Sequence, residues 1–398
     1  MKKGWEIKTL ADICTFENGD RGVNYPSKAK RTSTGIPFIN AGHFFDNKID
    51  FTNMDYISRD RYNLMGSGKI QKGDILFCLR GSLGKFASVE NLSEGQIASS
   101  LVIVRSSELV SHEYLLAYFE SYLCEENIER YRGGAAQPNL SAKSLTQFTI
   151  PIPPLPEQQR IVSVLDEAFA SIAQAKSNAE RNLVNARELF EGVAREIFEA
   201  KGDDWDKGKV NEVCELKSGT TIPTSLERNK GDVLYTKIAD MNLPENLVEI
   251  HTSSRFVNSD EINRNQIIPE GAIIFPKRGG AIATNKKRKI IKPTIVDLNT
   301  MAIIPSNKID KDFLFCWFQL FDLKDISNGA NIPQINNYSF DEIYIPYPKS
   351  LAEQRAIVGR LEALSAETGR LEEIYQQKIE SLEELKKSVL SEAFSGEL

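Results

Sequence analysis

Two long segments of the chain repeat apolar residues at alternating spacings of three and four, the pattern of a helix with a narrow apolar seam. The first covers residues 156–204 and contains one extra step of four, a stutter in the heptad pattern. The second covers residues 349–398 and carries Thr368, Tyr375 and Lys378 on its seam. One such helix is typical of a helix-bundle core, but two of equal length favour an intramolecular antiparallel coiled coil. The expected seam residues are Ile161, Leu165, Ile172, Leu183, Phe190, Ile197, Ile357, Leu361, Leu364, Leu371, Leu382 and Leu385.

The regions before the two helices have short apolar runs between turns rich in Gly, Asn and Asp. In the first region, residues 36–40, 74–78 and 100–104 predict strands, and residues 113–130 predict a helix. We therefore expect an α+β protein with mixed α/β domains at residues 1–155 and 205–348. Helical spacers at residues 156–204 and 349–398 separate these domains.

The two halves of the chain are copies of one another. When residue n is placed against residue n+200, matching motifs keep their order and their offsets stay within a few residues of 200. A repeat of this length predicts two homologous halves related by an approximate two-fold axis. The matching pairs include Trp5 and Trp205, Gly73 and Gly271, Arg80-Gly81 and Arg278-Gly279, and Glu157-Gln158 and Glu353-Gln354.

The chain of 398 residues has a net charge of −6, which by itself argues against nucleic-acid binding. The charges of the separate regions remove this argument. Residues 1–155 carry 18 Lys and Arg against 17 Asp and Glu, and residues 205–348 carry 18 against 18. The helical spacers carry 6 against 10 and 7 against 10. The acidity therefore belongs to the helices, and a local cationic cluster on a balanced domain can still hold phosphates.

Cations gather in predicted turns of both mixed domains. For most of these clusters a solubilising loop explains the pattern as well as a phosphate contact does. The run Lys286-Lys-Arg-Lys289, with Lys292 nearby, favours phosphate binding more clearly. The candidate DNA-binding residues are Arg31, Asn40, His43, Arg80, Ser82, Lys85, Lys237, Lys277, Arg278, Lys286, Lys287, Arg288 and Lys289.

Two Arg-Gly pairs, Arg80-Gly81 and Arg278-Gly279, each follow a predicted strand and lead into a glycine turn. This arrangement places a guanidinium beside backbone N–H groups, which suits a guanine edge or a phosphate. The alternative is a strand-ending turn whose arginine pairs with a neighbouring carboxylate, and recurrence in both halves favours the functional interpretation. The Gly134 and Gly329 turns carry neutral residues, so we expect them to end a helix and return the chain into the last strand of each domain. Nucleic-acid contact is the less favoured alternative for these two turns.

No catalytic constellation is recognisable in the sequence. The phosphate-binding loop of nucleotide hydrolases and the signatures of methyl transfer are missing, and three histidines offer too few convergent ligands for a triad or a metal centre. The five cysteines lie far apart, which predicts neither a disulfide framework nor a zinc site. A polar start and the lack of a long apolar run predict a soluble, cytoplasmic protein without a membrane span.

Four features of the chain resemble the DNA-specificity subunits of type I restriction–modification enzymes. The resemblance implies two target recognition domains that are held apart by paired helices, each reading one half of a split, asymmetric site in double-stranded DNA. The four features are the Trp5 and Trp205 openings, the strands after Gly73 and Gly271, the Ile-Pro-x-Pro…Glu-Gln junctions at residues 150–158 and 345–354, and the ending Ala393-Phe-Ser-Gly-Glu-Leu398.

The resemblance also implies partner subunits and their cofactors. Two methyltransferase subunits would bind S-adenosylmethionine and methylate adenine, and restriction subunits would use ATP and Mg²⁺, while this chain would bind no cofactor and catalyse no reaction. Asp74 of the first copy is Ala272 in the second, and Cys78-Leu79 of the first is Pro276-Lys277 in the second. From these two differences we expect the two loops to read different bases. Three alternatives stay open: an enzyme with an unrecognised site, a protein-binding assembly scaffold, and the specificity subunit of a methylation-only system.

Overall fold

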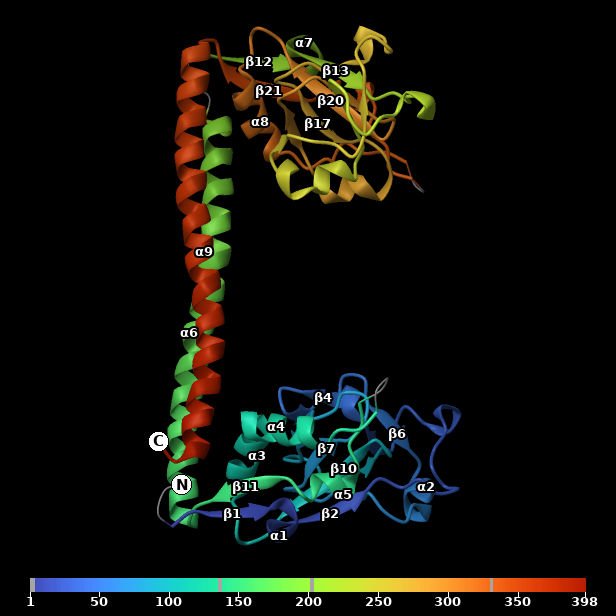
Figure 1. Cartoon of the computed structure of the whole chain (residues 1–398), viewed down its shortest axis with the longest axis vertical. Helices are drawn as coiled ribbons and strands as arrows, with labels where there is room; N and C mark the ends of the chain where they lie inside the picture. The colour runs from blue at the N-terminus through green and yellow to red at the C-terminus, as the bar shows by residue number, and fades with distance from the viewer. Residues whose placement is uncertain (1–3, 135–137, 201–203, 330–331) are drawn as a thin grey trace. The chain divides into compact units, whose positions relative to one another are not determined.

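The computed structural model of the chain describes residues 4–134, 138–200, 204–329 and 332–398. Its internal contacts divide it into two compact units (Figure 1). Unit 1 consists of residues 1–179 and 377–398, and unit 2 consists of residues 180–376. Each unit therefore contains one mixed domain together with a part of both long helices.

The two apolar seams belong to the helices α6 (Leu155–Glu199) and α9 (Leu351–Ser395), each 45 residues long. In both units these helices lie side by side (Figure 1). Ion pairs join them: Lys176 contacts Glu383 in unit 1, and Arg187 Nε lies 2.8 Å from Glu372 Oε2 in unit 2. Residue numbers rise along one helix as they fall along the other, so the pairing is antiparallel, as the sequence predicts.

All of the expected seam residues except Leu385 are buried or half-buried. Leu385 is 47% exposed, and Lys378 is exposed as well, so the prediction was wrong at these two positions. The half-buried side of α9 carries Ile379 and Lys386 instead. The Lys386 ammonium lies 4.9 Å from the centre of the Phe169 ring, which shows how a lysine on the seam covers apolar surface with its stem.

The shift by one residue has a simple cause in the heptad pattern of α9. The half-buried positions Leu371, Tyr375 and Ile379 are separated by two consecutive steps of four. This is a stutter, which replaces Lys378 by Ile379 and Leu385 by Lys386 on the seam while Leu382 keeps its place. The sequence showed the equivalent stutter in α6, between residues 175 and 183, but not the one in α9, where Tyr375 and Lys378 keep the spacing of three.

The described residues of unit 1 form three sheets. Strands in the order β2-β10-β7-β8-β5-β4 form the largest, β6-β3-β9 form the second, and β1-β11 form a two-stranded antiparallel ribbon. The strands are β1 (Glu6–Thr9), β2 (Cys14–Asn18), β3 (Ile36–Ile39), β4 (Phe44–Phe45), β5 (Lys48–Ile49), β6 (Asp55–Ile57), β7 (Ile75–Cys78), β8 (Phe86–Ser88), β9 (Gln96–Ile97), β10 (Leu101–Ser106) and β11 (Thr149–Ile152). The short helices are α1 (Leu10–Ile13), η1 (Lys28–Lys30), η2 (Ala41–His43), α2 (Arg59–Leu64), α3 (His112–Glu120), α4 (Tyr122–Tyr131) and α5 (Ala142–Leu145).

Unit 2 repeats this topology, without an equivalent of β4 among its described residues. Its sheets follow the orders β13-β20-β17-β18-β15, β16-β14-β19 and β12-β21, which confirms the duplication and the α+β class. The strands are β12 (Trp205–Lys209), β13 (Cys214–Ser218), β14 (Val233–Thr236), β15 (Glu249–Ile250), β16 (Phe256–Val257), β17 (Ile273–Pro276), β18 (Arg288–Ile290), β19 (Thr294–Val296), β20 (Thr300–Pro305) and β21 (Tyr344–Pro348). The short helices are α7 (Val210–Val213), η3 (Thr224–Leu226), η4 (Asp240–Asn242), η5 (Pro244–Asn246), η6 (Arg264–Gln266), η7 (Gly279–Thr284), α8 (Lys311–Gln319) and η8 (Asn337–Phe340).

The helix predicted at residues 113–130 is two helices, α3 and α4, because Ser121 breaks it. Ser121 is buried and has the extended backbone angles φ −81° and ψ 157°. Its hydroxyl donates to the Tyr118 carbonyl at 2.7 Å. This local hydrogen bond offers the backbone an alternative to the helix, as serine side chains commonly do.

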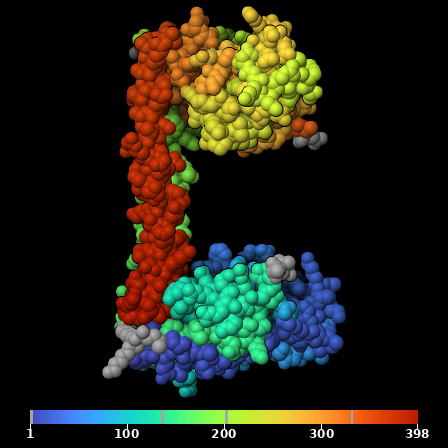
Figure 2. All heavy atoms as spheres, viewed as in Figure 1, coloured from blue at the N-terminus to red at the C-terminus, as the bar shows by residue number. Residues whose placement is uncertain are grey.

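Aromatic contacts fix each mixed domain to a long helix. In unit 1, the rings of Tyr114 and Tyr118 on α3 lie 5.1 and 6.0 Å from the ring of Phe394 on α9. Figure 2 shows this end of α9, in red, lying directly against the domain. In unit 2, Phe198 of α6 takes the same place, 5.2 Å from Phe313 on α8. The core of each domain therefore continues into its own part of the coiled coil.

Candidate nucleic-acid interface

The Arg-Gly turn of unit 1 follows β7 directly. Gly81 has φ +79°, a left-handed conformation that turns the chain back toward β8. The backbone of Arg80 forms a bridge with Asn139, and the Leu140 N–H donates to the Leu79 carbonyl at 2.9 Å. The turn is therefore built from two segments that lie about sixty residues apart in the sequence.

Unit 2 builds the same turn after β17. Gly279 has φ +71°, and Arg278 forms the bridge with Gln334. The Ile335 N–H donates to the Lys277 carbonyl at 2.9 Å. The chain then runs through η7 before it reaches β18, so the second turn is longer than the first.

Both arginine side chains are exposed. Within residues 4–134, 138–200, 204–329 and 332–398, neither the Arg80 nor the Arg278 guanidinium has a hydrogen-bond or ion-pair partner. A strand-ending turn held by an arginine–carboxylate pair would show such a partner. Ser82 and Lys85 of the first turn are exposed beside Arg80. The two turns thus present cations to solvent that have no partner in the described part of the chain, which is the arrangement that phosphate or base-edge contacts require.

A surface hollow of about 380 Å³ lies beside Arg80, and Arg21 is a second cation on its lining. Arg21 Nη2 donates to the Ser99 carbonyl at 3.1 Å, and the residue is exposed. Sequence reasoning missed Arg21, although Arg21-Gly22 is a further Arg-Gly pair just after a strand. Unit 2 has a lysine near the matching strand end: Lys277 Nζ donates to Ser218 Oγ at 3.0 Å. Burial, with the adjacent Arg278, lowers the pKa of Lys277.

After the Gly134 and Gly329 turns the chain takes a different path from the expected one. Instead of returning straight into the last strand, the chain after each turn pairs with the Arg-Gly turn, through Asn139 in unit 1 and Gln334 in unit 2. Residues 135–137 and 330–331 of these turns lie outside the described residues. The two glycine-containing turns and the two Arg-Gly turns therefore belong to one surface in each unit.

The basic run at residues 286–289, which favoured phosphate binding in the sequence, faces inward. Lys287 is 1% exposed, and its ammonium donates to the Phe321 carbonyl at 2.5 Å and lies 5.1 Å from the centre of the Phe318 ring. Burial lowers the pKa of Lys287 to about 8. The strand pairing gives Lys287 the position that Phe86 holds in unit 1, so this lysine replaces a core aromatic residue.

The other three cations of this run also have partners inside unit 2. Arg288 is 9% exposed and donates through Nη2 to the Met241 carbonyl at 3.1 Å. Lys289 is half-buried, with its ammonium 2.9 Å from Glu249 Oε1 and 3.1 Å from Asp312 Oδ1. Lys286 contacts the Asn242 side chain. The expectation of a free phosphate-binding cluster is thus corrected, because the second repeat uses these charges to support β18.

The remaining four candidates lie in a second region of each domain. Arg31 forms an ion pair with Asp55 (Nη1–Oδ2 2.6 Å), and Lys237 forms one with Glu227 (Nζ–Oε1 3.2 Å). Asn40 caps η2, since its Oδ1 accepts from the Gly42 N–H at 2.8 Å. His43 is 7% exposed, and its Nδ1 accepts from the Asn40 N–H at 3.2 Å. These side chains already hold local structure.

We expect His43 to make unit 1 sensitive to mild acid. Burial lowers the pKa of His43 in the folded protein, so on acidification the unfolded chain binds a proton at this residue first. The free energy of unfolding therefore falls as the pH drops below about 6.5, and it stops falling once the pH is below the folded-state pKa. In unit 2 Asp240 accepts the equivalent hydrogen bond from the Lys237 N–H at 2.8 Å. Between pH 7.5 and 5.5, the unfolding temperature should fall less for His43→Asp than for the wild type. Equal losses would contradict this account.

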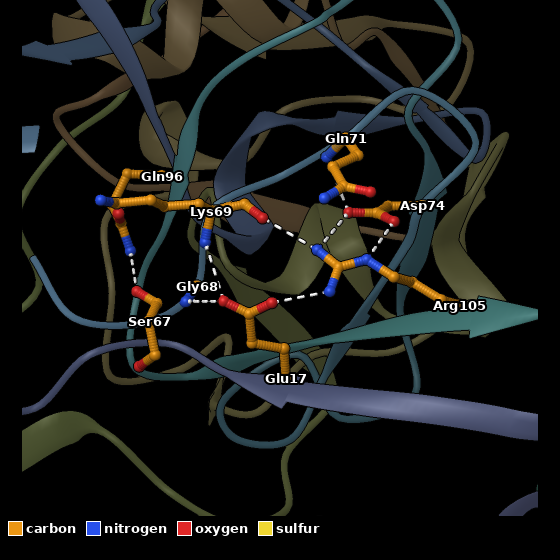
Figure 3. Close-up of polar contacts among 8 residues, drawn as sticks. All are labelled: Glu17, Ser67, Gly68, Lys69, Gln71, Asp74, Gln96 and Arg105. Atoms are coloured by element: carbon orange, nitrogen blue, oxygen red, sulfur yellow. Dashed lines mark hydrogen bonds and ion pairs between the residues drawn. The ribbon is translucent and has the colours of Figure 1, made fainter.

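A polar network holds one loop of unit 1 against its largest sheet (Figure 3). Arg105 on β10 pairs with Asp74 (Nε–Oδ1 2.8 Å) and with Glu17 (Nη1–Oε2 2.7 Å), and its Nη2 donates to the Lys69 carbonyl at 2.9 Å. Glu17 also accepts from the Gly68 N–H at 2.6 Å. Burial alone would raise the pKa of Glu17, but these hydrogen bonds outweigh it and lower the pKa.

Of the two differences from which we expect the loops to read different bases, the one at Asp74 lies inside the domain. The Asp74 side chain is only 3% exposed and points to Arg105, so it cannot reach DNA. Strand pairing places Ala272, Ile304 and Lys217 of unit 2 at the positions of Asp74, Arg105 and Glu17. Lys217 Nζ donates to the Ile267 carbonyl at 3.0 Å and so holds the corresponding loop with the opposite charge.

The described part of the chain offers no group of three or more His, Cys, Asp and Glu side chains that could hold a metal ion. All five cysteines are unpaired thiols, and burial raises the pKa of Cys14 to about 12. Among the described helices none is long and apolar enough to cross a membrane.

Comparison with known proteins gives one consistent result. The family model for the type I restriction modification DNA specificity domain matches the chain twice, at residues 2–181 and 202–381. The putative type I restriction enzyme MjaX specificity subunit of Methanocaldococcus jannaschii is 24% identical over all of this chain and 94% of its own length. The type I restriction enzyme EcoKI specificity subunit of Escherichia coli is 22% identical over all of this chain and 90% of its own length.

Two solved structures share the fold. A chain from a study of assembly and conformational transition in the type I R-M system aligns with a TM-score of 0.80 at 18% identity, covering 100% of this chain and 99% of that one. The HsdS subunit from Thermoanaerobacter tengcongensis aligns with a TM-score of 0.67 at 18% identity, covering 100% and 98%.

Proposed function

This chain belongs to the type I restriction modification DNA specificity family, and from that premise we propose that it recognises a bipartite, asymmetric site in double-stranded DNA. Specificity subunits are the non-catalytic members of these systems, and the enzymatic activities lie in partner subunits. We expect the partners to be two methyltransferase subunits, which bind S-adenosylmethionine, and restriction subunits, which use ATP and Mg²⁺.

The observation that carries the proposal is the recurrence, on the same turn in both units, of one exposed arginine without a partner among the described residues. Arg80 and Arg278 each lie on a backbone bridge to a second loop, which orders the turn before any ligand arrives. Two copies of one reading element suit two half-sites. The turns differ in length and in their neighbouring cations, Arg21 and Lys85 against Lys277, so two different half-site sequences are expected.

We propose that the long helices are a strut between recognition domains at residues 1–155 and 205–348. A helix of 45 residues is about 68 Å long, and its pairing with a second helix makes it stiff. Reading modules fixed on such a strut would enforce one gap between the half-sites, as the spacing rule of two-fold DNA binders requires. The spacers at residues 156–204 and 349–398 then act as rulers.

Exposed apolar side chains on these helices offer contacts to partner subunits. Val184, Leu189 and Ile374 in unit 2 are 49%, 49% and 55% exposed, although they lie on a coiled coil. The spacers are acidic, so DNA phosphates are repelled there and helices of other proteins are the better ligands. This supports a role of the spacers in carrying the methyltransferase and restriction subunits.

The test of the proposal is to express the chain with its methyltransferase partner and map methylated adenines across a genome. We expect one split recognition sequence with a fixed gap, and binding that weakens steeply with salt. Methylation or cleavage by the purified chain alone would favour an enzyme. Salt-independent behaviour without any sequence preference would favour a protein-binding scaffold.

We expect the strut to set the gap in a predictable way. Inserting four residues into both helices, after Ala179 and after Gln376, adds about 6 Å and a second stutter, and should lengthen the preferred gap by one or two base pairs. The measurement is methylation of a target library with varied gaps. The control carries the insertion in α6 alone, which mismatches the two seams and should abolish methylation. An unchanged gap in the double insertion would contradict the strut.

A further inference from the structure

A fully buried glutamine ties the first turn of α6 to the recognition domain of unit 1. Gln158 is 0% exposed and is the fourth residue of the helix. Its Oε1 accepts from the Ser111 N–H at 2.8 Å, and its Nε2 donates to the carbonyls of Leu109 at 3.0 Å and Pro153 at 2.8 Å. Ser111 is the N-cap residue of α3, and Pro153 follows β11. One amide therefore holds the helix, the strand before it and the start of α3.

Unit 2 repeats this contact almost atom for atom. Gln354 is 0% exposed and is the fourth residue of α9. Its Oε1 accepts from the Asp310 N–H at 2.7 Å, and its Nε2 donates to the carbonyls of Lys308 at 2.9 Å and Pro348 at 2.8 Å. Asp310 is the N-cap residue of α8. The distances differ from those of Gln158 by no more than 0.1 Å.

All six partners of the two glutamines are backbone groups. The residues that supply them differ between the units, for example Leu109 against Lys308 and Ser111 against Asp310, yet the contacts are the same. Both amide N–H groups and the carbonyl of each glutamine are used, so the side chain is satisfied. A contact that reads only the backbone can hold any recognition domain, whatever sequence that domain carries.

The glutamines supply something that the surrounding core cannot. Ile161 and Leu165 of α6 pack against the domain core of unit 1, but apolar contact has no preferred direction. Hydrogen bonds are directional, and three of them from one planar amide leave a single orientation between helix and domain. The apolar core thus attaches the domain, and the glutamine fixes its angle.

We infer that Gln158 and Gln354 are positioning residues that set the angle at which each recognition domain leaves its helix, and through it the strictness of the gap between the half-sites. The inference rests on the proposed function, because a gap has meaning only for a bipartite DNA site. In addition to the length of the paired helices, the inference makes the fixed angle between each domain and its helix a determinant of the gap.

The angle is testable without DNA or partner subunits. Spin labels at Lys72→Cys and Glu167→Cys, both exposed positions of unit 1, report the distance between domain and helix in a Cys316→Ser background. In Gln158→Met we expect the width of the distance distribution to at least double. The matched control is Gln159→Met, an exposed glutamine one residue away, which should leave the width unchanged. A wild-type width in a folded Gln158→Met variant overturns the inference.

A second variant guards against loss of folding. Gln158→Glu keeps the acceptor for the Ser111 N–H but turns a carboxylate toward two carbonyls, so it should broaden the distribution as well. Circular dichroism establishes that each variant is folded. If both variants fail to fold while Gln159→Met folds, the residue is needed for folding and the inference is overturned.

Methylation of the gap library then tests the consequence for DNA. In complex with the methyltransferase, Gln158→Met should reduce discrimination against gaps one base pair too long or too short by about tenfold, with half-site base preferences unchanged. Unchanged discrimination despite a broadened distance overturns the role in gap strictness. If the wild type methylates no bipartite site at all, the proposed function fails, and the spin-label result alone then decides the positioning role.

Discussion

Replacing Arg80 by alanine should relax or weaken recognition in one half of the DNA site and leave the other half as in the wild type. The same change at Arg278 should affect the opposite half only. An arginine bonded to a guanine edge is worth about 1–3 kcal/mol, or roughly 5- to 150-fold in affinity. Arg80 has no competing partner among the described residues, so the free protein need not break an ion pair to offer its guanidinium.

The outcome also separates the two contacts that the turn can make. If Arg80 reads a base, Arg80→Ala relaxes preference at one position, whereas loss of a phosphate contact weakens all sequences alike and lowers the salt slope by about one. Arg80→Lys should preserve a phosphate contact but not a two-pronged base contact. The control is Arg59→Ala, which removes an exposed arginine of the same domain that is paired with Glu94. Binding and methylation unchanged in both Arg80 and Arg278 variants would contradict the interface.

The sequence predicts most of the architecture because the signals involved are long and repeated. A heptad seam of 45 residues and a duplication with a constant offset stay recognisable even where single positions could be read in two ways. The paired helices and the two mixed domains can therefore be predicted from them. The errors are local. Ser121 splits a predicted helix through one hydrogen bond, and Ile379 rather than Lys378 follows Tyr375 on the seam of α9. Each of these two errors depends on a single side chain, and the hydrophobic pattern of the sequence does not show the effect of one side chain.

The candidate interface could be predicted only in part, because sequence does not show which charges are already paired. The basic run at residues 286–289 is the densest cluster of positive charge in the chain, yet Lys287 occupies the place of a core phenylalanine. Arg80 and Arg278 lie outside any dense basic run, but glycine turns expose them. Comparing the two repeats position by position would have helped, since Phe86 stands where Lys287 stands.

The network around Arg105 illustrates how the repeats diverge in their interiors while keeping one backbone. Unit 1 holds its loop with Glu17, Asp74 and Arg105, and unit 2 uses Lys217, Ala272 and Ile304. Buried charges must be exchanged together, because one charge left without its partner costs more than the whole set contributes. The coupled exchange therefore predicts strong non-additivity among these three positions.

Asp74→Ala should lower the free energy of unfolding of unit 1 by about 2–3 kcal/mol, somewhat below the value for a fully buried pair because Arg105 keeps partial access to water. Arg105→Ile should lower the free energy of unfolding by at least as much, since it leaves two carboxylates without their partner. The triple change Glu17→Lys, Asp74→Ala and Arg105→Ile copies unit 2 and should lie within about 1 kcal/mol of the wild type.

The measurement is urea unfolding followed by the fluorescence of Trp5, which lies in the core of unit 1, with Trp205 and Trp317 of unit 2 replaced by phenylalanine. The triple variant is its own control, because it contains both single changes and puts a lysine at residue 17, where its counterpart Lys217 donates to a backbone carbonyl. Costs that simply add, so that the triple variant is the least stable of all, would mean that the network acts as separate contacts. Recovery in the triple variant would show instead that the two repeats reach one loop position by opposite charges, as the hydrogen bond from Lys217 to the Ile267 carbonyl indicates.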